Sequence, residues 1–141
     1  MSVIDAGTDG GNPVWTFDSF REGVVIGSST QKIDADFSEQ WLSIYEPLDG
    51  RKDLPYGVVQ LVTMKAYAEV VAPRPPGNIH AAQQCFVHEI PGVERALFSE
   101  VSCIAKHNRR GRKMVDFKVD TRDLESQRPM CSSVLKICWA I

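Results

Sequence analysis

Two short stretches of the chain carry groups that could do chemistry. The first contains Glu46 and Asp49, and the second is Tyr56 followed by Gly57, where a long apolar run begins. A helix that starts at glycine leaves backbone N–H groups, here those of Gly57 and Val58, free to hold an oxyanion or a carbonyl oxygen. Carboxylates just before such a helix could transfer a proton.

Each of these residues also has a purely structural interpretation. Asp49 could act as a carboxylate base with Glu46 or Tyr45 as its partner, because neighbouring acids push each other's pKa values apart. The same acids could equally be solvated residues of a turn. Tyr56 could aim its hydroxyl at a bound carbonyl or pack against the helix start. Gly57 could serve as a donor or be required for close packing.

The one cluster of basic residues in the sequence is segment 107–113. Arg109 and Arg112 within it could contact phosphate groups, an acidic partner or nucleic acid, or form a solvated hairpin tip. A formal net charge of −2 argues against a general polyanion-binding protein. No aromatic residues alternate with these charges, which argues against nucleic acid. His80 and His88 are predicted to share one strand face, too far apart for a joint metal site.

The composition indicates a single globular domain in a reducing compartment. With 141 residues, 43% hydrophobic and 24% charged, we expect one domain over 15–141 after a Gly-, Asp- and Ser-rich arm over 1–14. Four cysteines without C-x-x-C spacing indicate buried free thiols, with no metal and no cofactor. No apolar run approaches the roughly 18–20 residues that span a bilayer. We therefore expect a cytoplasmic protein that does not bind membranes.

The helices and strands that position these groups can be predicted from the spacing of apolar residues along the chain. A strand is predicted from Gly23 to about Ile33, and Asp34 then caps a short helix that Pro47 ends. A helix over 57–71 is apolar nearly all round, which is typical of a helix buried on most sides. Prolines over 73–76 stop it.

The second half of the chain changes to a period of two. Strands are predicted over 79–88, 93–106, 115–121 and 131–141, with a hairpin turn at 108–111. In the third of these strands one face is expected to carry Val115, Phe117, Val119 and Thr121, and in the last the apolar face is expected to carry Leu135, Ile137, Trp139 and Ile141. Helices followed by strands in hairpins indicate an α+β fold. An antiparallel sheet with one apolar face must cover something, so we expect it to wrap around the long apolar helix.

Four segments in this order resemble the hotdog fold, and more narrowly the MaoC-like hydratase/dehydratase family. Phe17–Gly23 matches the family's F-x-x-F-x-x-G start, and Gln31–Phe37 is similar to its first strand-to-helix passage. Leu54–Val58 stands where the family has a His-Gly pair opening the central helix. Phe86–Gly92 is similar to the Phe- and Pro-Gly-containing stretch that follows. The resemblance covers roughly residues 17–141.

This resemblance implies a homodimer, or a heterodimer with a related hotdog subunit, that binds an acyl-CoA or acyl-carrier-protein thioester at the subunit interface. Family hydratases use the Asp and His of a D-x-N-P-x-H motif, while the helix-start glycine polarises the thioester carbonyl. Setting Pro47 on the motif's proline places Ile44 at the acidic position. Glu46 then takes the asparagine position and Asp49 the histidine position. An aliphatic side chain cannot exchange a proton, so the usual dyad is absent.

Three functions follow from the resemblance. The chain could be a non-catalytic subunit that shapes the acyl pocket for a catalytic partner. It could be an enoyl-CoA hydratase/dehydratase of altered mechanism that uses Asp49, with Tyr56 beside it. It could also be a hotdog thioesterase, which needs one carboxylate such as Asp49 or Asp53 near the helix-start glycine. In each case the phosphates of coenzyme A could meet the basic segment 107–113.

Overall fold

A computed structural model describes residues 12–44 and 56–141. The elements follow the order η1 (Phe17–Ser19), β1 (Val24–Lys32), α1 (Ala35–Ile44), α2 (Tyr56–Val70), β2 (Ile79–Val87), β3 (Ala96–Arg109), β4 (Arg112–Asp123) and β5 (Pro129–Trp139). Most of the predicted arm lies outside the described residues, and so does the acidic segment with Tyr45, Glu46, Asp49 and Asp53.

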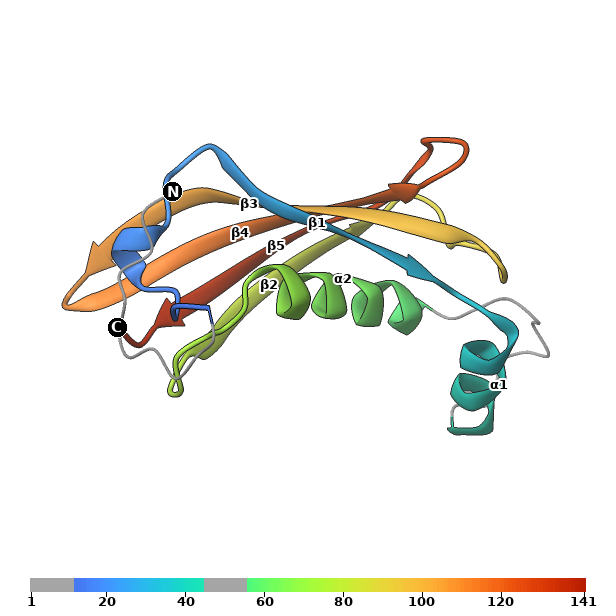
Figure 1. Ribbon diagram of the computed structural model, residues 1–141, viewed down its shortest axis with the longest axis horizontal. Helices are drawn as coiled ribbons and strands as arrows, with labels where there is room; N and C mark the ends of the chain where they lie inside the picture. Colours follow the sequence, from blue (N-terminus) through green and yellow to red (C-terminus); the bar gives the residue numbers. More distant parts are fainter. Residues whose placement is uncertain (1–11, 45–55) are drawn as a thin grey trace.

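The five strands form one antiparallel sheet in the order β1-β3-β4-β5-β2. Figure 1 shows the sheet curving over α2, which lies along one of its faces, while α1 projects at the end where β1 finishes. The predicted α+β fold, a sheet wrapped around one long helix, is therefore confirmed.

Local sequence signals account for the boundaries of two elements. The carboxylate of Asp34 accepts a hydrogen bond from the backbone N–H of Phe37 at 2.8 Å, which is the predicted N-cap of α1. Arg110 and Gly111 have φ values of 53° and 79°, so β3 and β4 are joined by a tight two-residue turn. The predicted turn at 108–111 is thus confirmed in its last two residues only, because Asn108 and Arg109 belong to β3.

Two apolar clusters and a polar row between them fill the space under α2. The larger cluster lies under the C-terminal half of the helix and includes Phe20, Ala66, Tyr67, Phe117 and Trp139. The smaller lies near the helix start and contains Ile33, Val58, Val62, Leu97 and Met130. The buried side chains between them are polar or thiol-bearing: Thr63, Ser99, Thr121, Cys131 and Ser133. The hydroxyls of Ser99 and Thr121 hydrogen-bond each other across β3 and β4 at 2.7 Å.

The predicted faces of the strands hold in β4 and fail at one place in β2. Residues paired directly across two strands point to the same side of the sheet. His80 is opposite the buried Ile137, but a bulge between His80 and Ala82 shifts the register, so Phe86 and its neighbours at even positions face away from α2. The prediction that His80 and His88 share a face was wrong, because this bulge puts them on opposite faces.

Two smaller expectations about the strands were also wrong. The strand predicted over 93–106 is displaced by three residues to 96–109, because Val93 and Glu94 belong to the preceding turn, where Glu94 has a φ of 66°. Ile141 was assigned to the apolar face of the last strand, but β5 ends at Trp139 and Ile141 is 41% exposed.

Candidate functional site

The start of α2 is built against the tryptophan of α1. A Cβ added to Gly57 would lie 2.9 Å from Cζ2 and 3.1 Å from Cη2 of Trp41, closer than side chains normally approach. Trp41 is held in place by stacking on Phe37, with ring centroids 6.3 Å apart, and both pack against the smaller apolar cluster. Close packing alone therefore requires glycine at this position.

The same helix start offers backbone donors. The first N–H groups of any α-helix have no acceptor within the helix, so those of α2 need an acceptor from outside it, such as an anionic or carbonyl oxygen. Val58 is fully buried, backbone and side chain alike, and packs in the smaller cluster. Tyr56 opens the helix. The role of Asp49 stays a prediction, since it lies outside the described residues.

A pair of glutamines one turn into α2 was not singled out in the sequence. The side-chain amide of Gln83 in β2 donates to the side-chain oxygen of Gln60 in α2 at 2.5 Å, and both residues are half-buried. This bond joins the helix to the edge strand three residues beyond Gly57. Gln60 could have been noticed as one of the few polar residues of an apolar helix, but its partner could be found only from the fold.

The two candidate arginines lie far from Gly57 within one chain. Arg109 and Arg112 are exposed and directly paired at the tip of the β3–β4 hairpin. Leu97, at the other end of β3, packs with Val58 near the start of α2. The strand between Leu97 and Arg109 is about 40 Å long at roughly 3.3 Å per residue. Figure 1 shows the hairpin and the start of α2 at opposite ends of the sheet.

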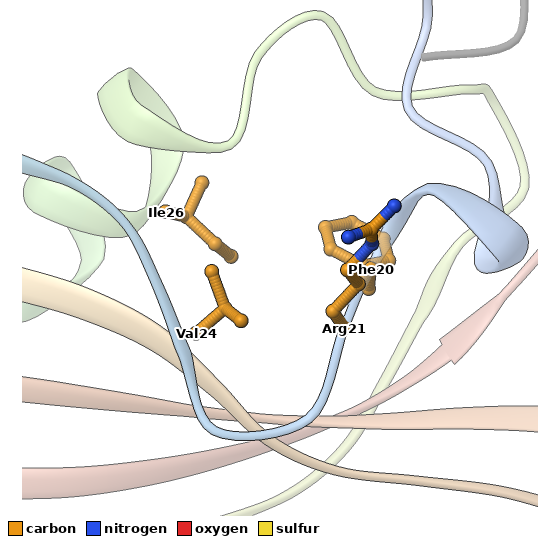
Figure 2. Close-up of a pocket in the computed structure, with 4 residues that line it drawn as sticks. All are labelled: Phe20, Arg21, Val24 and Ile26. Carbon is orange, nitrogen blue, oxygen red and sulfur yellow. The ribbon is translucent and has the colours of Figure 1, made fainter. Parts of the chain in front are cut away.

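Several cavities lie on the described residues. One, of about 110 Å³, lies beside the start of β1 and is lined by Phe20, Arg21, Val24 and Ile26 (Figure 2). A cavity of about 30 Å³ lies between the end of β1, α1 and α2, and Phe37 and Leu61 are among the residues that line it. A shallow hollow of about 260 Å³ lies around β4 and β5, lined by His88, Glu100, Asp120, Thr121, Arg122, Gln127, Pro129, Cys131 and Ser132.

The titratable groups most perturbed by their surroundings serve the fold. A hydrogen bond from Arg95 at 2.7 Å, together with backbone N–H groups of the 125–126 turn, holds the pKa of the Asp123 carboxyl well below its usual range. Burial raises the pKa of Tyr67 to about 12. Among residues 12–44 and 56–141, no group of three or more His, Cys, Asp or Glu side chains could hold a metal ion. No helix in this part of the chain is long and apolar enough to cross a membrane.

Comparison with known proteins shows the fold but no close relative. No protein family description and no curated protein sequence matches the chain. Among solved structures, a MaoC-like dehydratase from Rhodospirillum rubrum superposes with a TM-score of 0.71 at 13% identity, covering 88% of this chain and 96% of the other. A complex of HadBC, a (3R)-hydroxyacyl-ACP dehydratase from Mycobacterium tuberculosis, gives 0.65 at 9% identity over 82% and 95%. The fluoroacetyl-CoA-specific thioesterase FlK, bound to fluoroacetate and CoA, gives 0.64 at 12% identity over 84% and 94%.

These likenesses extend over nearly the whole of each chain. The protein therefore has the hotdog fold, as the sequence motifs predicted, and it is similar in structure to MaoC-like dehydratases and to hotdog thioesterases. At such low identity the comparison establishes the fold alone. The activity must be argued from the site.

Proposed function

We propose that this chain is a MaoC-like protein of the cytoplasm that binds an acyl thioester, carried by coenzyme A or an acyl carrier protein, at the start of α2. The observation that carries the proposal is the helix start itself. Gly57 stands at the second position of the one helix that the sheet encloses, in a fold shared with dehydratases and a thioesterase named for thioester substrates. The backbone N–H groups there would polarise the thioester carbonyl.

The proposed site needs a second subunit. An acyl-CoA held at Gly57 cannot also reach Arg109 of the same chain, about 40 Å away along β3. Strand β2 is one of the two edges of the described sheet, and Ile79 and Phe86 on it are each 61% exposed. On α2, Leu61 is half-buried. Antiparallel pairing of β2 with its counterpart in a second hotdog subunit would cover these groups.

Such pairing also gives the hairpin a role. A two-fold axis through paired β2 strands reverses one sheet relative to the other, so the hairpin of one subunit would lie at the same end as the α2 start of its partner. Arg109 and Arg112 of one subunit would then meet the phosphates of a ligand whose thioester lies at Gly57 of the other. The HadBC complex provides a precedent for a hotdog assembly of two different chains.

For catalysis, the proposal is that the chain acts as the pocket-forming partner of a catalytic subunit. Ile44, at the motif's acidic position, is 71% exposed on α1 and cannot exchange a proton. A hydratase or dehydratase of altered mechanism, with Asp49 and Tyr56 as its acid and base, is the alternative within the same family.

Binding can be tested directly by titrating the full-length chain with crotonyl-CoA and with free CoA in a calorimeter. We expect both to bind and crotonyl-CoA to bind more tightly, because only it offers a carbonyl to the helix start. Arg109→Ala with Arg112→Ala should weaken both ligands about tenfold or more, with the loss shrinking at high salt. Arg128→Ala, which removes an exposed arginine paired with Glu89, is the matched control. If neither ligand binds to a preparation that sedimentation shows to be dimeric, the proposal fails.

Activity separates the catalytic alternatives. A pocket-forming subunit on its own should not hydrate crotonyl-CoA. Turnover that disappears in Asp49→Asn would establish the altered hydratase instead. Turnover that survives Asp49→Asn would exclude the mechanism drawn for that enzyme.

A thioesterase is the second candidate function, favoured by the likeness to FlK over 94% of that chain. Hydrolysis of an acyl-CoA by a water that Asp49 or Asp53 activates would release free CoA. The release of thiol, followed with a thiol reagent, distinguishes hydrolysis from hydration, which leaves the thioester intact.

A further inference from the structure

Two thiols meet beneath α2. Cys85 in β2 and Cys131 in β5 both face the helix, and their Sγ atoms are 3.1 Å apart. Both are free cysteines. The hydroxyl of Ser133 lies 3.4 Å from Sγ of Cys131. The pair is therefore in direct sulfur–sulfur contact across adjacent strands.

The two thiols differ in access. Cys85 is half-buried on the edge strand, whereas Cys131 is 2% exposed inside the sheet. Burial also raises the pKa of the Cys131 thiol to about 11, so it is protonated at neutral pH. A reagent from solvent would therefore meet Cys85 first and find Cys131 behind it.

We propose that Cys85 and Cys131 form a reversible dithiol–disulfide site that is oxidised by small-molecule disulfides, with Cys85 as the attacking and Cys131 as the resolving thiol. The Cys85 thiolate attacks one sulfur of the reagent disulfide and releases one reagent thiolate. Cys131 then loses its proton and attacks the Cys85 sulfur of the mixed disulfide, releasing the second. The two protons lost by the protein end on the two reagent thiols, and the two electrons reduce the reagent disulfide.

The strand register determines how far the two sulfur atoms must move before this disulfide can form. Cys85 is paired with Ser133, and Cys131 with Val87, so the two cysteines are diagonal neighbours. Diagonal positions are more widely spaced than directly opposed ones, and the sulfurs must approach by about 1 Å to reach bonding distance. Since β2 is held by β5 on one side only in the described sheet, it can move to close this gap. The bond would then tie the edge strand to the sheet.

The test is oxidation of the full-length protein with excess oxidised glutathione, followed by alkylation, intact mass measurement and peptide mapping under non-reducing conditions. We expect loss of two hydrogen atoms, a linked pair of peptides containing Cys85 and Cys131, and two of the four thiols still alkylated. Reduction should restore all four. The oxidised protein should unfold at a higher urea concentration.

Variants test the two roles separately. Cys131→Ala should accumulate a mixed glutathione disulfide at Cys85, whereas Cys85→Ser should protect Cys131 from modification. The control is Cys103→Ser with Cys138→Ser, which should leave the linked pair unchanged. Cys103 lies in β3, and Cys138 lies at the other end of β5 from Cys131, on the opposite face of the sheet. Stable glutathionylation of Cys85 in the unsubstituted protein, or absence of the linked peptides, would overturn the proposal.

Discussion

At the scale of single residues, Gly57 combines a packing requirement with the binding role that we propose for it. We predict that Gly57→Ala destabilises the protein, because the new methyl would lie 2.9 Å from the Trp41 ring. Overpacking typically costs about 1–3 kcal/mol, more than the roughly 1 kcal/mol by which alanine favours a helix over glycine. Urea unfolding measures the difference. In a Trp41→Phe background, which removes the ring atoms in question, the cost should become smaller, and an unchanged cost would contradict the steric explanation.

Asp123 illustrates a second kind of residue, a buried carboxylate whose charge stabilises the fold. Its pKa is depressed in the folded protein by Arg95, so the unfolded chain takes up this proton at a higher pH than the folded chain does. The resulting stability is complete above about pH 4, the ordinary pKa, and is lost as the pH falls toward the depressed value. We predict that Asp123→Asn removes this part of the acid dependence of unfolding.

The matched control for that measurement is Glu125→Gln. Glu125 also faces Arg95, at 3.8 Å, but its side chain is 88% exposed. An exposed ion pair contributes little to stability. The Glu125→Gln protein should therefore still lose stability as the pH falls below about 4. Equal loss in both variants would mean that the charge of the turn as a whole, rather than the buried carboxylate, is responsible.

At the scale of elements, the β3–β4 hairpin depends on its two-residue turn. Gly111 has a φ of 79°, where a side chain costs about 1–2 kcal/mol. We predict a loss of that size in Gly111→Ala, measured by thermal or urea unfolding. Arg110→Asn at the neighbouring position should be neutral or stabilising, because asparagine tolerates a positive φ better than arginine does. A neutral Gly111→Ala would show that the turn can adopt another geometry.

The same elements show what the sequence could and could not predict. Periodicity and turn chemistry are local, so the N-cap at Asp34, the apolar helix that became α2 and the inward face of β4 were all predicted correctly. The bulge after His80 carries no local signal, because it arises from the pairing of β2 with β5. The Gln60–Gln83 bond and the contact between Cys85 and Cys131 likewise depend on which strand lies beside which.

At the scale of the whole molecule, the separation between Gly57 and the hairpin makes the binding proposal depend on assembly. We predict that the chain forms a dimer through β2, either with itself or with a related subunit. In the homodimer case, Ile79→Asp with Phe86→Asp should shift sedimentation from dimer to monomer, because both side chains are 61% exposed on the edge strand and added charges oppose pairing there. The control is Ile44→Asp, which places one such charge at a 71% exposed position on α1.

The dimer prediction also links assembly to ligand affinity. If Arg109 and Arg112 serve the neighbouring subunit, the monomeric variant should bind CoA as weakly as the double arginine variant, and combining the two sets of substitutions should weaken binding no further. The Ile44→Asp control, which should remain dimeric, should bind CoA as tightly as the unsubstituted protein. A monomeric variant that still binds CoA tightly would show that one chain holds the whole ligand, and that the hairpin plays no part in the site.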